Sequence, residues 1–129
     1  MISIGVIVLT SCQKDDDETR NDARVDVTVL DNDGTKIPAI TVKMYDEAAY
    51  QKFENNNLTE PTMSVVTNSE GIAIFTLNYD DWFLLQKDRL FRFVVQFGGG
   101  NTNYQIWSAG KTIRPGDTVK MDLKLTNYP

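Results

Sequence analysis

The sequence predicts an all-β fold, a seven-stranded antiparallel sandwich with Greek-key connections and a short helical insertion. Three observations lead to this class. Apolar residues alternate with polar ones in short stretches, which is the pattern of half-buried strands. Clusters of Asn, Asp, Gly and Ser separate these stretches and mark turns. Helical spacing occurs only briefly, whereas a parallel sheet needs a crossover helix after most of its strands.

The first predicted strand begins near Arg24 and alternates three valines with polar residues, at Val25, Val27 and Val29. The turn Asn32-Asp33-Gly34 follows, in residue types that accept a positive φ. A second strand has its apolar set at Ile40, Val42 and Met44. Residues 47–54 then change to helical spacing, and Asn55-Asn56-Asn57 ends a short helix inside the connection.

Two further strands are predicted after this helix. The third has its alternating set at Met63, Val65 and Thr67, before a turn at residues 68–71. The fourth places Ala73, Phe75 and Leu77 on one face, although Ile72 and Ile74 leave the choice of buried face open.

The last three strands complete the predicted sandwich. Residues 90–97 place four apolar side chains on one face, and a Gly-rich turn follows at 98–101. Residues 104–109 form the sixth strand. In the seventh strand an apolar face lies opposite Lys120, Asp122 and Lys124, and it consists of Val119, Met121, Leu123 and Leu125.

The composition excludes several classes of function. The chain has 129 residues, a formal net charge of −5, one Cys and no His. The lack of His removes the commonest metal ligand and the base of a serine triad, and a single Cys excludes an intrachain disulfide or thiolate cluster. The acidic balance opposes nucleic-acid binding, which needs a basic footprint. We therefore predict no enzymatic activity, no metal, no cofactor and no nucleic-acid partner.

Residues 1–11 form an uncharged, largely apolar segment that ends at Cys12, the only cysteine. At about 1.5 Å of rise per residue, a helix of this length is far shorter than a ~30 Å hydrocarbon core. It matches the apolar region of a secretory signal peptide, and since the usual basic residues do not precede it, we expect the true start upstream of Met1. A buried N-terminal strand with a free thiol is the alternative. The predicted domains are a signal peptide at 1–11, a tether at 12–23 and one sandwich at 24–129.

The residues around Cys12 resemble two motifs of bacterial lipoproteins. Leu9-Thr10-Ser11-Cys12 resembles a lipobox, which implies cleavage before Cys12 and acyl chains such as palmitate on this residue as a membrane anchor. The following run resembles the export signal of surface lipoproteins of Bacteroidetes, and it consists of Gln13, Lys14, Asp15, Asp16, Asp17 and Glu18. This resemblance implies an outer-membrane protein that faces the cell exterior. A plain solvated tether is the alternative explanation of the run.

A further resemblance covers residues 24–80 and 114–126. It rests on Asp33-Gly34, Ile37-Pro38, Ile40, Val42, the series Thr67, Gly71, Phe75 and Leu77, and the segment from Arg114 to Val119. This pattern is similar to the transthyretin-like or carboxypeptidase-regulatory-like β-sandwich, which is related to the Cna-B-type repeats of collagen adhesins. The resemblance implies an immunoglobulin-like or prealbumin-like sandwich. Such modules are mostly non-catalytic and stabilise or present other parts.

Aromatic residues beside two carboxylates form the candidate ligand site, at Tyr79-Asp80-Asp81-Trp82-Phe83. Together with Trp107 and Tyr104, these rings are of the type on which a sugar ring stacks, while the carboxylates accept hydroxyl protons. The alternative is that Trp82, Phe83 and Leu84 cover an open end of the sandwich and that Asp80 or Asp81 caps a helical turn.

Two smaller signals concern modification and calcium. Asp117-Thr118-Val119 resembles the O-glycosylation pattern of Bacteroidetes, so Thr118 is a candidate acceptor, although a turn entering a strand explains the same residues. Asp31-Asn32-Asp33-Gly34 groups oxygen ligands but lacks the ligand spacing of an EF-hand, and we interpret it as a turn.

Two functions of different classes therefore remain open. The first is a surface lipoprotein whose sandwich is a non-catalytic interaction or structural module with a protein partner. The second is a carbohydrate-binding accessory lipoprotein of a polysaccharide-uptake system. An exposed, coplanar set of the aromatic rings would favour the second. A partner strand added to an open sheet edge is a third option.

Overall fold

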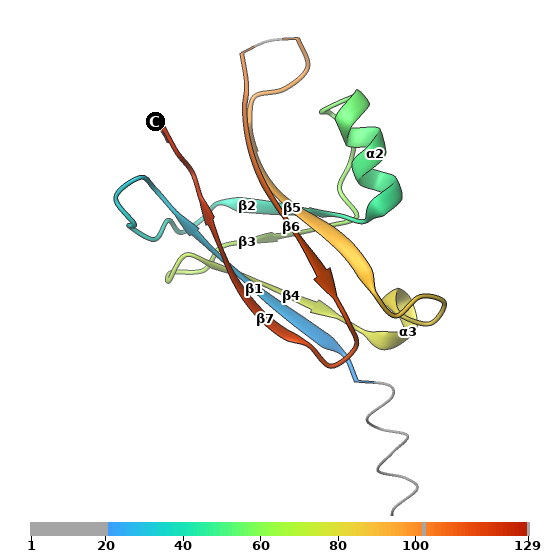
Figure 1. The fold of residues 1–129 in the computed structure, drawn as a ribbon. Coiled ribbons are helices and arrows are strands. Elements are labelled where there is room, and N and C mark those ends of the chain that lie inside the picture. The colour runs from blue at the N-terminus through green and yellow to red at the C-terminus, as the bar shows by residue number, and fades with distance from the viewer. Residues whose placement is uncertain (1–20, 102, 129) are drawn as a thin grey trace, which may run out of the picture.

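Two β-sheets face each other in the computed structural model, which describes residues 21–101 and 103–128 (Figure 1). The three-stranded sheet has the order β4 (Ile72–Leu77), β1 (Ala23–Leu30), β7 (Thr118–Lys124). The four-stranded sheet has the order β3 (Met63–Val66), β2 (Thr41–Tyr45), β5 (Arg89–Phe97), β6 (Gln105–Ile113). The predicted all-β sandwich is thus confirmed, while the proposed signal peptide, Cys12 and the acidic run lie outside the described residues.

One strand pair departs from the predicted antiparallel arrangement. β1 and β7 pair in parallel, with Val27 opposite Met121, whereas the other pairs are antiparallel. The chain reverses its direction between successive strands, so all odd-numbered strands run the same way. Because β7 crosses to the other sheet and lies beside β1, the two odd-numbered neighbours have to be parallel.

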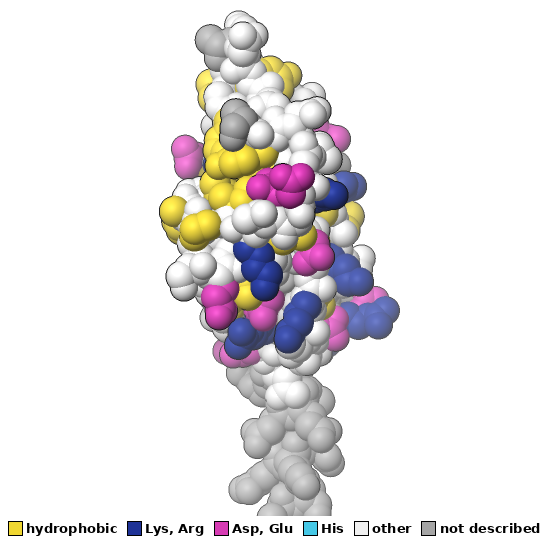
Figure 2. All heavy atoms as spheres, turned by 90° about the vertical axis from the view of Figure 1, so that its left-hand side faces the viewer, with side chains coloured by type: hydrophobic (Ala, Val, Ile, Leu, Met, Phe, Trp, Pro, Cys, Tyr) yellow, Lys and Arg dark blue, Asp and Glu magenta, His cyan; other side chains and the backbone are white. Residues whose placement is uncertain are grey.

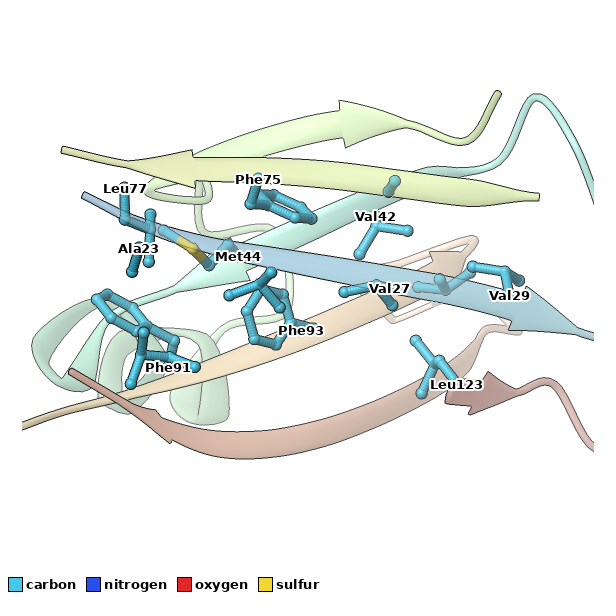
Figure 3. Close-up of a cluster of buried hydrophobic side chains, with 14 of the residues drawn as sticks. Ala23, Val27, Val29, Val42, Met44, Phe75, Leu77, Phe91, Phe93 and Leu123 are labelled. Carbon is cyan, nitrogen blue, oxygen red and sulfur yellow. The ribbon is translucent and has the colours of Figure 1, made fainter. Parts of the chain in front are cut away.

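The main core fills the space between the two sheets (Figure 3). The rings of Phe75 and Phe93, one from each sheet, lie 5.2 Å apart between their centroids at an angle of 64°. In β4, Ala73, Phe75 and Leu77 are fully buried and Ile74 is 38% exposed, which decides the buried face that the sequence left open.

Helix α2 (Glu47–Asn55) confirms the predicted short helix and covers the outer face of the four-stranded sheet (Figure 1). The Asp46 side chain caps its N-terminus by accepting from the Ala49 amide at 2.9 Å. Beneath the helix lies a second hydrophobic cluster, which we call the helix cluster: Tyr45, Phe53 and Val94 are buried, with Ala49, Tyr50 and Ile106 packed against them.

Thr67 and Gly71, two of the residues on which the resemblance to the transthyretin-like sandwich rests, stabilise turns that connect the sheets. The Thr67 hydroxyl accepts from the Ile40 amide at 2.9 Å and donates to the Ile37 carbonyl at 2.8 Å. Gly71 has a φ of 76°, its carbonyl accepts from the Val29 amide, and a Cβ on it would lie 2.8 Å from the Lys36 Cβ. These motif residues therefore stabilise turns and packing.

Candidate functional site

The first candidate aromatics close one end of the sandwich. Tyr79 is 9% exposed and Phe83 is fully buried. Trp82 is half-buried, and its ring lies 5.4 Å from that of Phe91 at an angle of 81°. Leu84, by contrast, is 58% exposed and takes no part in this cover. The rings of Tyr79, Trp82 and Phe83 therefore do not present a common flat surface to the solvent.

The short helix α3 (Tyr79–Trp82) carries these residues, and its cap differs from the predicted one. The side chain of Asn78 accepts from the Asp81 amide at 2.9 Å. The carboxylate of Asp22 accepts from the Tyr79 amide at 2.9 Å, which ties the helix to the chain just before β1. Asp80 and Asp81 lie in the first turn instead, where negative charge interacts favourably with the positive end of the helix dipole.

Trp107 lies toward the other end of the sandwich. Its ring packs on Phe97 at 5.7 Å, and its indole Nε1 donates to the Thr126 carbonyl at 3.0 Å. Phe91 and Phe97 are six positions apart in β5, which corresponds to about 20 Å along a strand. Trp82 and Trp107 consequently belong to separate aromatic groups, and the four predicted residues do not form one site.

A groove between α2 and the β5–β6 hairpin brings Tyr104, a ring that the sequence singled out, together with amide groups that it did not. We call it the helix–hairpin groove. It has a volume of about 410 Å³ and is lined by Tyr50, Phe53, Glu54, Asn55, Asn57, Tyr104 and Ile106. Tyr104 is 50% exposed. The Tyr50 ring stacks on that of Phe53, with 5.8 Å between the centroids, and the Arg92 guanidinium lies 4.9 Å from the centroid of the Tyr50 ring.

Asn57 fixes the shape of this groove. Its side-chain oxygen accepts from the Gly100 amide at 2.6 Å, and its carbonyl accepts from Gln96 Nε2 at 3.0 Å. Both contacts join the segment after α2 to the hairpin. The run of three Asn residues ends the predicted helix, and the fold places two of them, Asn55 and Asn57, in the same groove as Tyr104. Two phenol rings, amides and one carboxylate in a preformed groove are groups that bind a polar, hydroxyl-bearing ligand.

Arg89 links three elements through its side chain, and these contacts are structural. Its guanidinium lies 2.9 Å from Glu47 and 3.6 Å from Asp46, and it donates to the Trp82 carbonyl at 2.8 Å. Burial raises the pKa of Glu47, but hydrogen bonds from Arg89 and from backbone amides outweigh it and leave the pKa below its ordinary value. Arg89 thus joins the start of α2, the start of β5 and the end of α3.

The remaining polar candidates have local roles. The Asp31 carboxylate accepts from the amides of Asp33 and Thr35, both at 2.9 Å, so it stabilises the predicted turn. Within residues 21–101 and 103–128, no three His, Cys, Asp or Glu side chains come together as metal ligands. Thr118 begins β7 and is exposed, and its modification stays a prediction. None of the helices among these residues is long and apolar enough to span a membrane.

Comparisons with known proteins add little to this description. The sequence matches no family model and no curated protein. Among solved structures, "The Bacillus anthracis TIE protein" is similar with a TM-score of 0.49 and 16% identity. The match covers 81% of this chain and 16% of that chain. This likeness carries no argument about function.

Proposed function

We propose that this protein is a lipoprotein of the outer membrane that faces the cell exterior, and that its sandwich is a non-catalytic interaction or structural module. One observation carries the proposal: the only cysteine directly follows a short apolar segment and directly precedes the run Gln13 to Glu18. Acyl chains on Cys12 would anchor the chain stably, since several chains together are effectively permanent in a bilayer.

The fold supports the module part of this proposal. The motif residues Thr67 and Gly71 hold turns and strand crossings, as expected of the transthyretin-like or Cna-B-like modules that the sequence resembles. On the face in Figure 2, Lys/Arg and Asp/Glu side chains are interspersed below and beside a group of hydrophobic side chains. A mixed surface of this kind suits contact with a protein partner better than contact with a polyanion.

Lipidation is tested in a bacterial host that modifies lipoproteins. We expect a clickable palmitate analogue to label the wild-type chain and not Cys12→Ala. Protease treatment of intact cells then tests surface exposure: the wild type should be cleaved, and replacement of Asp15, Asp16 and Asp17 by Ala should protect it. Labelling without cleavage of the wild type would restrict the proposal to a lipoprotein that faces the periplasm.

Carbohydrate binding is the second candidate function, and the helix–hairpin groove favours it. Tyr104 offers an exposed ring, and Asn55, Asn57 and Glu54 offer polar groups in the same groove. A glycan array tests this candidate with Tyr104→Ala, and Val66→Ala on the β3 edge serves as the matched control because Val66 is similarly exposed, at 56%. Binding by the wild type and the control but not by Tyr104→Ala would support it. Equal binding by all three would place the ligand elsewhere.

A further inference from the structure

We propose that Leu84 and Leu85 form a membrane-contacting tip, which rests on the same lipid surface that holds Cys12 and so orients the domain. This inference rests on the proposed lipid anchor. It concerns a surface of the sandwich outside the helix–hairpin groove.

The two leucines are exposed to a degree that is rare for their type. Leu85 is 100% exposed and Leu84 is 58% exposed, side by side in the loop between α3 and β5. Together with Trp82 they line a hollow of about 310 Å³, whose other lining residues are polar or charged: Asp80, Asp81, Gln86 and Arg89. Single exposed leucines are common, but an adjacent pair beside a half-buried Trp is an apolar surface that favours removal from water.

The structure holds this loop so that the leucines project from it. On one side, Phe83 is fully buried and its amide donates to the Tyr79 carbonyl at 2.9 Å. On the other side, the Lys87 ammonium donates to the Tyr79 hydroxyl, and Asp88 pairs with Arg114 at 2.9 Å. Leu84, Leu85 and Gln86 are exposed between these contacts, so no rearrangement is needed to present the two leucines.

The position of the tip relative to the anchor identifies the membrane as its occupant. Asp22 accepts from the Tyr79 amide at 2.9 Å, so the chain enters the domain beside α3 (Figure 1). Asn21 follows Cys12 by nine residues. Whatever path they take, nine residues span at most about 32 Å. The anchor therefore keeps this end of the domain close to the lipid surface.

Leu58, another strongly exposed leucine among the described residues, lies at the opposite end and serves as a built-in comparison. Leu58 is 64% exposed, and Cβ atoms on Gly99 and Gly100 of the β5–β6 hairpin would contact it. Two leucines hold a free protein on a bilayer only weakly, but attachment through Cys12 makes the contact intramolecular and gives it a high effective concentration. The contact would turn the helix–hairpin groove away from the membrane.

Hydrogen exchange on membrane-attached protein tests the tip directly. The chain from Cys12 onward is coupled through its single thiol to a maleimide-headgroup lipid in phosphatidylcholine vesicles. The same chain, capped with N-ethylmaleimide and mixed with such vesicles, is the reference. We expect coupling to slow amide exchange at residues 84–87 by at least about threefold, and to leave residues 56–60 unchanged.

Variants separate insertion of the leucines from mere proximity to the vesicle. The double variant Leu84→Ser, Leu85→Ser should lose the slowing, and Leu58→Ser should retain it. Slowing that persists in the double variant, or that is absent in the wild type, would overturn the proposal. Because Cys12 is coupled chemically, this outcome does not depend on lipidation in cells. Palmitate labelling in turn does not depend on Leu84 and Leu85, so the two failures are distinguishable.

Discussion

The main core and the helix cluster differ in how many parts of the chain build them. The main core receives buried side chains from both sheets and from the α3 segment. The helix cluster has three buried residues, Tyr45, Phe53 and Val94, and a single nine-residue helix closes it. Disruption of the main core removes contacts on which both sheets depend, whereas disruption of the helix cluster releases only α2. We therefore expect the main core to govern global stability and the helix cluster to govern a local opening.

The largest expected effect comes from the centre of the main core. Phe93→Ala removes a fully buried ring that packs on Phe75, and we expect a loss of about 3–5 kcal/mol in the free energy of unfolding. Urea denaturation followed by circular dichroism measures this loss. Val66→Ala, on the exposed edge, is the control and should change stability by less than about 0.5 kcal/mol. A small loss for Phe93→Ala would mean that this ring is not part of the core.

The second prediction concerns a variant that lacks the corresponding ring of the helix cluster, Phe53→Ala. Phe53 is 5% exposed and packs 4.7 Å from the Tyr45 ring, so Phe53→Ala should cost about 3 kcal/mol, at the lower end for such changes. The cost should be local: amides of residues 49–55 should exchange faster, while those of β1 and β7 keep their rates. Uniformly faster exchange would show instead that the two clusters unfold as one unit.

The same comparison explains which parts of the fold were predictable from the sequence. The main core follows period-two patterns such as Val25, Val27 and Val29, because one face of each strand is buried. Val94 breaks this rule, since it points to the outer face of β5 and is buried only because α2 covers it. Its burial depends on where the helix folds back, and that is a long-range property which no local pattern contains.

The candidate site was less predictable than the fold, for a related reason. Tyr79, Trp82 and Phe83 are adjacent in sequence, but their neighbours in space are core residues such as Phe91. Tyr104 and Asn57 lie far apart in sequence, and the β5–β6 hairpin brings them to one groove. The parallel pairing of β1 with β7 was likewise missed, because pairing between the first and last strands leaves no mark in either strand alone.

A third prediction concerns the turn contacts at the edge of the main core. Thr67→Val removes a hydroxyl that serves the Ile40 amide and the Ile37 carbonyl, and it leaves buried backbone groups without partners. We expect a loss of about 1–3 kcal/mol, smaller than for the core ring. Thr67→Ser keeps the hydroxyl and should recover most of this loss in the same urea measurement. No loss in Thr67→Val would mean that these hydroxyl contacts do not stabilise the fold, and equal losses in both variants would mean that the γ-methyl group contributes as much as the hydroxyl.

The fourth prediction uses high pH to weaken the helix cluster selectively. Burial, with a further contribution from Glu60, raises the pKa of Tyr45 to about 12. In the unfolded chain this phenol ionises near pH 10. Below that pH the free energy of unfolding is unaffected by ionisation of Tyr45, and it decreases as the pH rises from about 10 toward 12, because only the unfolded chain releases the proton in that range. The urea midpoint should therefore fall more between pH 9 and pH 11 in the wild type than in Tyr45→Phe. Equal falls would mean that Tyr45 ionises without cost in the folded protein.

The smallest expected effect concerns the ion pair that fastens α2 to β5. Glu47 is the partner of Arg89, and its pKa is lower in the folded state than in the unfolded chain. The ionised Glu47 therefore stabilises the fold above about pH 4.5, and this contribution is lost as the pH falls through the pKa of the folded state. Because the Glu47 side chain is 39% exposed, the contribution is at most about 1 kcal/mol. Stability measured between pH 6 and pH 3 should fall less steeply in Glu47→Gln than in the wild type. Asp88→Asn breaks a pair that is exposed by 60% and 66%, and it should leave this slope nearly unchanged. An equal reduction in both variants would mean that burial beside the helix cluster gives the Arg89 pair no advantage over a pair in solvent.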